Sequence, residues 1–176
     1  MLKKREIRPT AWSKAFYYYK KKEFDYIWFI EDDVFISSLS ALGDLDNKYK
    51  EEDLLVGHAE VYNGDKESWY WWQWVPESLA EPWGVSLNCA SRFSYRLFQS
   101  ITDYCLEHKE EKGVLFNEYL FHTLALHNNY RVRAAEEMQI VYRKDWTREE
   151  FQKGFLYHPI KDFSDHEIYR IELKFA

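Results

Sequence analysis

The 176-residue sequence has few of the residues that mark several common protein classes. It contains two cysteines, six glycines and four prolines, and it shows no internal repeat or low-complexity segment. It has no apolar run of about 18 residues, the length that a membrane-spanning helix needs. Its first residues are basic and polar, unlike a hydrophobic signal peptide. A disulfide-rich scaffold and a transmembrane chain are therefore not expected.

Basic charge is also scarcer than acidic charge. The chain has 24 Lys and Arg against 30 Asp and Glu, which gives a net charge of −6 and a pI of about 5.6. A broad nucleic-acid-binding surface needs a basic face, so nucleic acid is not an expected partner. The lysine run at 20–22 is more typical of the solvated end of a helix.

The two cysteines, Cys89 and Cys105, stand 16 positions apart. They do not have the close spacing of metal-binding cysteine pairs, and they can form at most one disulfide. We expect two free, buried thiols.

Aromatic residues, by contrast, are abundant. Phe, Trp and Tyr make up 19% of the chain, and eight residues are tryptophan. Large aromatic rings fill cores, and they also form platforms for the flat apolar faces of ligands such as sugar rings. Composition alone leaves both uses open.

Apolar spacing predicts one α/β domain over residues 1–176. Apolar residues three or four positions apart predict helices, and runs of branched and aromatic residues predict strands. The run at 26–30 is apolar throughout, which indicates a central strand buried on both faces. Because strands alternate with helices, the central sheet should be mixed or parallel, flanked by helices. The expected helices are 10–24, 37–49, 90–113 and 115–129, and the expected strands are 26–30, 53–62, 130–136 and 138–143.

Other segments have local signals of their own. Residues 63–84 contain turn residues, two prolines and five tryptophans, which indicates a long, irregular, functional loop. Thr147 and Glu150 have the spacing of a capping box at a helix start. The segment 155–163 precedes what we expect to be a short tail.

The stretch DYIWFIEDDVFI, residues 25–36, places three acids at the end of the expected buried strand. Side chains alternate along a strand, so Glu31 and Asp33 should point one way and Asp32 the other. Carboxylates this close repel one another unless a cation or hydrogen-bond donors compensate. Oxygen ligands suit Mg²⁺ and Mn²⁺, which often bridge carboxylates to phosphates. The pattern favours a metal site for a phosphorylated ligand, or else a solvated acidic turn.

The segment WFIEDDVFI resembles the DxD motif of GT-A-type glycosyltransferases, in which a hydrophobic strand ends in acids that bind Mn²⁺ and a nucleotide-sugar. The resemblance implies a GT-A-like, Rossmann-like fold. It also implies that Asp33 is the main metal ligand, for Mn²⁺ or Mg²⁺. Glu31 and Asp32 would lie around the donor.

Two further matches extend this resemblance. In FNEYLF, Glu118 stands at an expected helix start, where inverting members carry the base that deprotonates the acceptor hydroxyl. In GFLYHPIKD, His158 matches a late histidine that ligates the metal, and Lys161 would contact the diphosphate.

Other readings of these residues remain open. Glu118 can be an ordinary first-turn glutamate favoured by the helix dipole. His158 can be a packed histidine at a strand end. Glu118 and His122 lie one helical turn apart and form a rival metal pair.

The tryptophan-rich loop lies between the donor motif and the candidate base, where the family usually builds its acceptor site. The resemblance implies that Gly84 brings backbone close to the sugar, with Asn88 a weaker candidate there. The alternative is a hydrophobic patch that packs against a partner. The rings expected to stack on sugars are Trp69, Trp71, Trp72 and Trp74.

The sequence departs from the family in one respect. A complete GT-A domain opens with a strand and loop that bind the nucleotide base, upstream of the DxD strand, whereas here one expected helix and no opening strand precede the strand at 26–30. The chain thus resembles the later part of the family domain, as a truncated or shortened member would. An exposed apolar sheet edge is expected in consequence.

Together these patterns and the resemblance predict a metal-dependent glycosyltransferase, with inversion favoured over retention. It would move a sugar from a UDP- or GDP-linked donor to a hydroxyl of a glycan, glycoprotein or glycolipid. The alternatives are a non-catalytic carbohydrate- or partner-binding domain of the same fold and a metal-dependent phosphoryl hydrolase. The resemblance implies the secretory pathway (Golgi lumen) for a eukaryotic member and the cytoplasm for a bacterial one.

Overall fold

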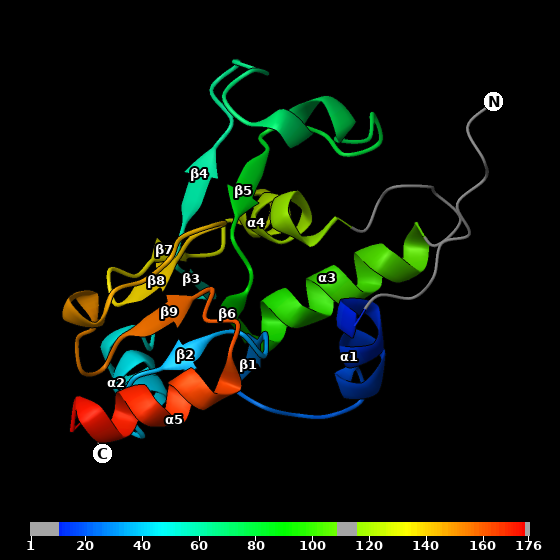
Figure 1. Ribbon diagram of the computed structural model, residues 1–176. Coiled ribbons are helices and arrows are strands. Elements are labelled where there is room, and N and C mark those ends of the chain that lie inside the picture. The colour runs from blue at the N-terminus through cyan, green and yellow to red at the C-terminus, as the bar shows by residue number, and fades with distance from the viewer. Residues whose placement is uncertain (1–10, 109–115, 175–176) are drawn as a thin grey trace.

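The computed structural model, which describes residues 11–108 and 116–174, has a mixed α/β fold built on three small β-sheets (Figure 1). The predicted α/β class is confirmed. The α-helices in this part of the chain are α1 (Ala11–Tyr19), α2 (Ala41–Lys48), α3 (Tyr95–Glu107), α4 (Asn117–His127) and α5 (Phe163–Glu172). The strands are β1 (Tyr26–Ile30), β2 (Phe35–Ile36), β3 (Leu54–Val56), β4 (Ala59–Val61), β5 (Gly84–Ser86), β6 (Ala90–Ser94), β7 (Val132–Ala134), β8 (Met138–Ile140) and β9 (Leu156–His158), with short 3-10 helices η1 (Tyr70–Trp74) and η2 (Arg148–Glu150).

The largest sheet has four strands in the order β1-β6-β3-β7. β1 and β3 both run antiparallel to β6, whereas β3 and β7 are parallel. The second sheet has the order β2-β9-β8, and β4 pairs with β5 in the third. The mixed sheet is thus confirmed, and its polarity places the ends of β1, β3 and β7 and the start of β6 at the same edge.

β1 covers the predicted residues but not the predicted position. It is an edge strand of the four-stranded sheet rather than a central one, and residues 27–30 are half-buried. Its run is apolar throughout because both faces pack: Ile27 and Phe29 against one hydrophobic cluster, Trp28 and Ile30 against another. β1 is therefore an apolar edge strand, but its apolar residues 27–30 are half-buried rather than exposed as predicted.

An aromatic cluster fills one face of this sheet, beneath α1, α3 and α4. Phe16 on α1 stacks on Phe98 of α3 with 4.6 Å between ring centroids and an interplanar angle of 6°. Trp12 packs against Phe29 of β1 and Phe121 of α4, at centroid distances of 5.4 and 5.6 Å. Much of the aromatic content is thus core, and it fixes α4 over the sheet.

The predicted helix 90–113 begins later than expected. Residues 90–94 form β6, the strand between β1 and β3, and the helix starts at Tyr95. The Ser94 side chain accepts a hydrogen bond from the backbone N–H of Leu97, which marks the helix start. Helical spacing of apolar residues continues backward through Phe93, which is why periodicity misplaced the start. Residues 109–113 of this prediction, and residue 115 of the next helix, lie outside the described residues.

Two other predicted boundaries differ. The single strand expected at 53–62 is divided into β3 and β4, which belong to different sheets, with Gly57 between them. A Cβ at Gly57 would come within 2.6 Å of Ile140 Cβ, so only glycine lets β8 pass this closely. The expected short tail instead contains α5, which begins after Asp162, whose side chain accepts from the backbone N–H of Ser164. The predicted capping box of Thr147 and Glu150 is present at η2.

β4 and β5 form an antiparallel arm that rises from the body of the molecule and carries η1 beyond it (Figure 1). The arm contains the Trp-rich segment, which is irregular apart from η1, as predicted for residues 63–84. Gly84, the last residue of that predicted loop, instead begins β5. Its N–H donates to Thr123 Oγ1 at 3.0 Å, which holds β5 against α4.

Replacement of Gly84 by alanine should destabilise the fold by about 1–3 kcal/mol. A Cβ there would lie 2.5 Å from Cγ of the buried His122 ring, and that ring is held by a hydrogen bond to the Val85 carbonyl. Urea unfolding measures the change. Gly43→Ala is the matched control, because no atom lies within 4 Å of its Cβ position in α2; it should add about 0.5–1 kcal/mol of stability. Equal effects of the two substitutions would contradict the close packing at Gly84.

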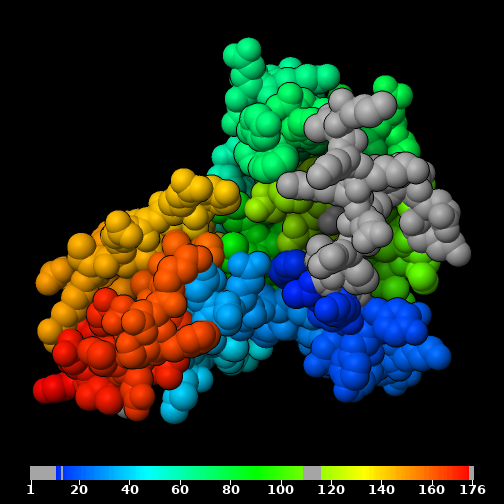
Figure 2. Space-filling view, turned by 45° about the vertical axis from the view of Figure 1, so that its right-hand side comes forward, coloured from blue at the N-terminus to red at the C-terminus, as the bar shows by residue number. Residues whose placement is uncertain are grey.

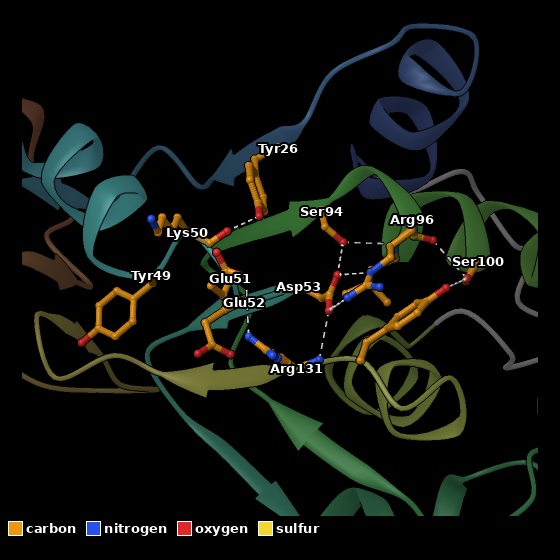
Figure 3. Close-up of polar contacts among 12 residues, drawn as sticks. Tyr26, Tyr49, Lys50, Glu51, Glu52, Asp53, Ser94, Arg96, Ser100 and Arg131 are labelled. Carbon is orange, nitrogen blue, oxygen red and sulfur yellow. Dashed lines mark hydrogen bonds and ion pairs between the residues drawn. The ribbon is translucent and has the colours of Figure 1, made fainter.

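A buried carboxylate ties three segments together at the sheet edge opposite the acids (Figure 3). Asp53 accepts two hydrogen bonds from the Arg96 guanidinium, both 2.6 Å long, and one of 2.6 Å from Ser94 Oγ. It also accepts the backbone N–H of Arg131 at 3.0 Å. Burial alone would raise the pKa of Asp53, but these donors lower it below its usual value. The carboxylate therefore links β3, β6 and the approach to β7.

Asp53→Ala should lower the free energy of unfolding at pH 7 by about 2–4 kcal/mol, since it leaves Ser94 and the Arg131 N–H without their acceptor. The lowered pKa means that the stabilisation is present above the usual value of 3.8 and is lost as pH falls through the folded-state value. Urea unfolding at pH 7 and pH 3 should show the gap between variant and wild type shrinking in acid. Asp103→Ala, at an exposed position on α3, is the control and should change stability by under about 0.5 kcal/mol. A gap that widens in acid would contradict this account.

Candidate functional site

The pairing of β1 with β6 makes Glu31 and Cys89 neighbours. The antiparallel register sets Ile30 opposite Ala90, so the next residue on each side lies just beyond the paired segment. The backbone N–H of Glu31 donates to the Cys89 carbonyl at 2.7 Å. Glu31, just after β1, and Cys89, just before β6, are thereby joined at the sheet edge predicted for the site.

β9 brings His158 to the same place. β9 runs antiparallel to β2, with Phe35 opposite Tyr157, and the N–H of Ile160 donates to the Asp33 carbonyl at 2.8 Å. The imidazole Nε2 of His158 then lies 3.4 Å from Asp33 Oδ1. The two residues predicted as metal ligands are thus side by side, although 125 positions separate them. Figure 2 shows their segments, light blue and orange, in contact.

The hydrogen bonding of His158 leaves one ring nitrogen available. Its Nδ1 lies 2.7 Å from the Val141 carbonyl oxygen, which can only accept, so Nδ1 carries the proton. The other ring nitrogen, Nε2, faces Asp33 Oδ1 at 3.4 Å. A ring held in this way by a backbone carbonyl is the usual arrangement of a histidine that ligates a metal.

Asp33 is also in contact with a cation of the chain. Lys161, predicted to contact a diphosphate, donates to Asp33 Oδ2, and its side chain is 77% exposed. Burial alone would raise the pKa of Asp33, but the hydrogen bond from Lys161 and the charges of His158 and Lys161 lower it below its usual value. Asp33 is therefore an ionised carboxylate at neutral pH, as a metal ligand must be.

Three side chains at this edge place ligand atoms together: Glu31, Cys89 and His158 each offer one, and all lie within 4.8 Å of one another. Cys89 was not among the predicted ligands, because its role depends on β6, which the sequence did not reveal. Burial, followed by the charge of Glu31, raises the pKa of the Cys89 thiol to about 12. Without a cation this side chain is therefore a neutral thiol. Both cysteines are free, as predicted, and both are half-buried rather than buried.

Glu118, the predicted base, lies in the first turn of α4. Burial, with a smaller contribution from the charge of Glu31, raises its pKa to about 7. The helix start is held by Asn88, whose Nδ2 donates to the Asn117 carbonyl at 2.9 Å and whose Oδ1 accepts from Ser86 Oγ at 3.1 Å. Asn88 is itself buried, so it positions Glu118 rather than facing a ligand. Gly84 likewise serves the contact between β5 and α4.

The rival pairing of Glu118 with His122 is not supported. His122 is buried, and its Nδ1 lies 2.9 Å from the Val85 carbonyl oxygen, with the ring packed on Gly84. Burial lowers the pKa of His122, so it is a neutral core residue.

The acids and the candidate base open onto one cavity of about 950 Å³. This volume is within the range of small-molecule sites. Cations line it together with the acids, which suits a phosphorylated ligand. Arg143 was missed by sequence reasoning, although it closes the apolar stretch 138–143 where a strand end was expected. The wall residues relevant to chemistry are Glu31, Asp33, Cys89, Glu118, Arg143, His158 and Lys161.

Asp32 does not line this cavity; because β1 ends at Ile30, the three acids lie in a turn, where the predicted strand alternation does not apply. Asp32 is exposed and lines a separate hollow beside α1, together with Trp12 and Ala15. Glu31 and Asp33 line both hollows. A donor in the larger cavity would therefore not contact Asp32 directly.

The predicted stacking tryptophans divide into two groups. Trp72 is only 3% exposed and packs on Trp83 and Tyr62, so its predicted role in sugar stacking is wrong; the ring is part of the core. Trp69 is half-buried beside Phe116. Trp71 and Trp74 are 40% and 59% exposed.

Trp71 connects the arm to the start of α4. Its ring lies 5.1 Å from that of Phe116, the residue at the N-cap of α4, and Glu118 follows two positions later. Trp71 therefore lies beside the start of the helix that carries Glu118.

Comparison with family models, curated proteins and solved structures finds no match for this chain. In the part of the chain that the structure describes, every helix is too short or too polar to cross a membrane.

Proposed function

We propose that this chain is a metal-dependent glycosyltransferase that moves a sugar from a nucleoside diphosphate to a hydroxyl group. One observation carries the proposal: Asp33 and His158 meet at the wall of a large cavity, and Glu118 lines the same cavity with a pKa of about 7. A cation-binding set and a separate base in one site are what such a transfer needs. The resemblance of WFIEDDVFI to the DxD motif supports the same function.

The residues fit a divalent cation. Asp33 is ionised, and His158 presents its Nε2 toward it. Such a cation, Mn²⁺ or Mg²⁺ by the resemblance, neutralises charge on a departing diphosphate. Lys161 and Arg143 line the same cavity and suit contacts with phosphate oxygens.

The proposed reaction places Glu118 at the acceptor. The acceptor hydroxyl oxygen forms a bond to the anomeric carbon while the bond from that carbon to the phosphate oxygen breaks. Glu118 takes the hydroxyl proton, and the nucleoside diphosphate leaves with the bonding electron pair. A base with a pKa near 7 is about half ionised at neutral pH, which suits proton transfer.

The exposed rings of the arm are proposed to form the acceptor side. Trp71 contacts Phe116 at the start of the helix that carries Glu118. A sugar stacked on Trp71 would thus approach the base from the arm. Tyr70 and Trp74 extend the exposed aromatic surface.

Calorimetric titration of the wild-type chain with UDP and with GDP, each with and without Mn²⁺, tests the proposal. We expect one nucleotide to bind in the presence of Mn²⁺ and to bind far more weakly after chelation. Binding of neither nucleotide in any condition, or equal binding with and without metal, would contradict it.

The exposed aromatic rings also favour a second candidate, a non-catalytic carbohydrate-binding domain. Titration with an oligosaccharide panel in the presence of a chelator distinguishes the two. Metal-independent glycan binding that Trp71→Ala removes, without nucleotide binding, would favour this second function.

A further inference from the structure

The donor atoms at the sheet edge are not those of a pure oxygen site. Glu31, Cys89 and His158 offer a carboxylate oxygen, a thiol sulfur and an imidazole nitrogen within 4.8 Å of one another. Mg²⁺ takes oxygen ligands almost exclusively, whereas thiolate and imidazole suit zinc and related ions. The chemistry of this set therefore differs from that of the acidic motif read alone.

We propose that Cys89 is a metal ligand, and that Glu31, Cys89 and His158 hold a divalent cation of the zinc or cobalt type in preference to Mg²⁺. This inference depends on the proposed function in one respect only: the nucleoside diphosphate of the donor would bind the same cation. The metal site itself can be measured without any nucleotide.

The geometry needs little adjustment. Zinc–ligand bonds of about 2.0–2.3 Å in a tetrahedron set neighbouring ligand atoms about 3.3–3.8 Å apart. The three atoms already lie within 4.8 Å, so side-chain shifts of about 1 Å suffice. The His158 ring is pre-oriented by its bond to the Val141 carbonyl, and Cys89 by the pairing of its carbonyl with Glu31 N–H.

A further ligand is near. Asp33 Oδ1 lies 3.4 Å from His158 Nε2, so this carboxylate can occupy a fourth position beside the imidazole. Lys161 now neutralises Asp33 and can move to solvent, because its side chain is largely exposed. On binding, the Cys89 thiol releases its proton to water and ligates as the thiolate.

Cobalt reports directly on a sulfur ligand. Chelator-treated protein titrated with Co²⁺ should develop a thiolate-to-cobalt charge-transfer band in the near ultraviolet. The Cys89→Ser variant should show no such band and should bind Co²⁺ and Zn²⁺ at least about tenfold more weakly, since loss of even an outer-shell partner costs that much. Its Mg²⁺ affinity should change little, so the preference for zinc over magnesium narrows.

Cys105→Ser is the matched control. Cys105 is also half-buried, but it lies on α3 beside an apolar pocket away from the acids. This variant should keep both the band and the affinity. A wild-type titration without the band, or a band that Cys105→Ser removes and Cys89→Ser leaves, would overturn the proposal.

A measurement on the wild type alone guards against a variant that does not fold. Alkylation by iodoacetamide, followed by peptide mass spectrometry, should be slowed at Cys89 by Zn²⁺ but not by Mg²⁺, while the rate at Cys105 stays unchanged. Equal rates at Cys89 with and without Zn²⁺ would overturn the proposal. A cobalt band without nucleotide binding would support the metal site and contradict the transferase function. Nucleotide binding with Mn²⁺ but no cobalt band would support the transferase function and contradict Cys89 as a metal ligand.

Discussion

We expect Asp33→Ala to abolish the metal dependence of nucleotide binding. Asp33 is an ionised carboxylate beside Nε2 of His158, so its loss removes both a ligand and the negative charge that attracts the cation. Affinity for UDP or GDP in the presence of Mn²⁺ should fall at least about 100-fold, the upper end of the cost of losing an outer-shell partner. Calorimetry with and without Mn²⁺ measures the difference.

Asp32→Ala is the matched control for this experiment. Asp32 is adjacent in sequence and equal in charge, yet it lines the separate hollow beside α1 and not the main cavity. It should retain metal-dependent binding. Asp33→Ala also removes the carboxylate that pairs with Lys161. Lys161 can then contact the nucleotide phosphates directly, so any remaining nucleotide binding should be insensitive to Mn²⁺. Full metal dependence in Asp33→Ala, or its loss in Asp32→Ala, would contradict the role of Asp33 as a ligand of the cation.

Glu118→Gln should leave nucleotide affinity unchanged and lower sugar transfer by about 10²–10⁴-fold, the usual contribution of a general base. The amide matches the carboxylate in shape but cannot take the acceptor proton. Release of UDP or GDP from a panel of nucleotide-sugars, with mono- and disaccharide acceptors in solution, measures transfer.

The pH profile separates a base from a merely structural residue. Since burial and Glu31 raise the pKa of Glu118 to about 7, the wild-type rate should rise as pH increases through that value, where the carboxyl loses its proton. In Glu118→Gln this inflection should be absent. Glu107→Gln, at an exposed position on α3, is the control and should retain both rate and profile. Unchanged turnover in Glu118→Gln would remove Glu118 as the base.

Local signals in the sequence were sufficient for several parts of this protein. The apolar run at 26–30 is β1 to the residue, and the capping box of Thr147 and Glu150 is present. Asp32 is left out of the main cavity, but the reason is the turn after β1 rather than strand alternation, because β1 ends at Ile30. These features depend on residues a few positions apart, so their physics is already complete in a short segment.

Contacts between distant segments could not be read in the same way. The sequence predicts a helix over β6 because Phe93 continues the apolar period of α3. Only the pairing of β6 with β1 and β3 identifies it as a strand. That error hid Cys89, whose place beside Glu31 follows from the β1–β6 register. Trp72 and its exposed neighbour Trp71 have the same residue type, but packing of the arm buries one ring and leaves the other at the surface.

The sequence therefore specified the acids, the aromatic content and the α/β alternation, since these follow from residue type and local period. The folded chain specified which acid meets His158, where Glu118 stands and that a thiol joins the set. The reason is physical: a carboxylate, an imidazole and a thiol act as one site only when strand registers bring them within a few ångströms. Here those registers join residues 31, 89 and 158.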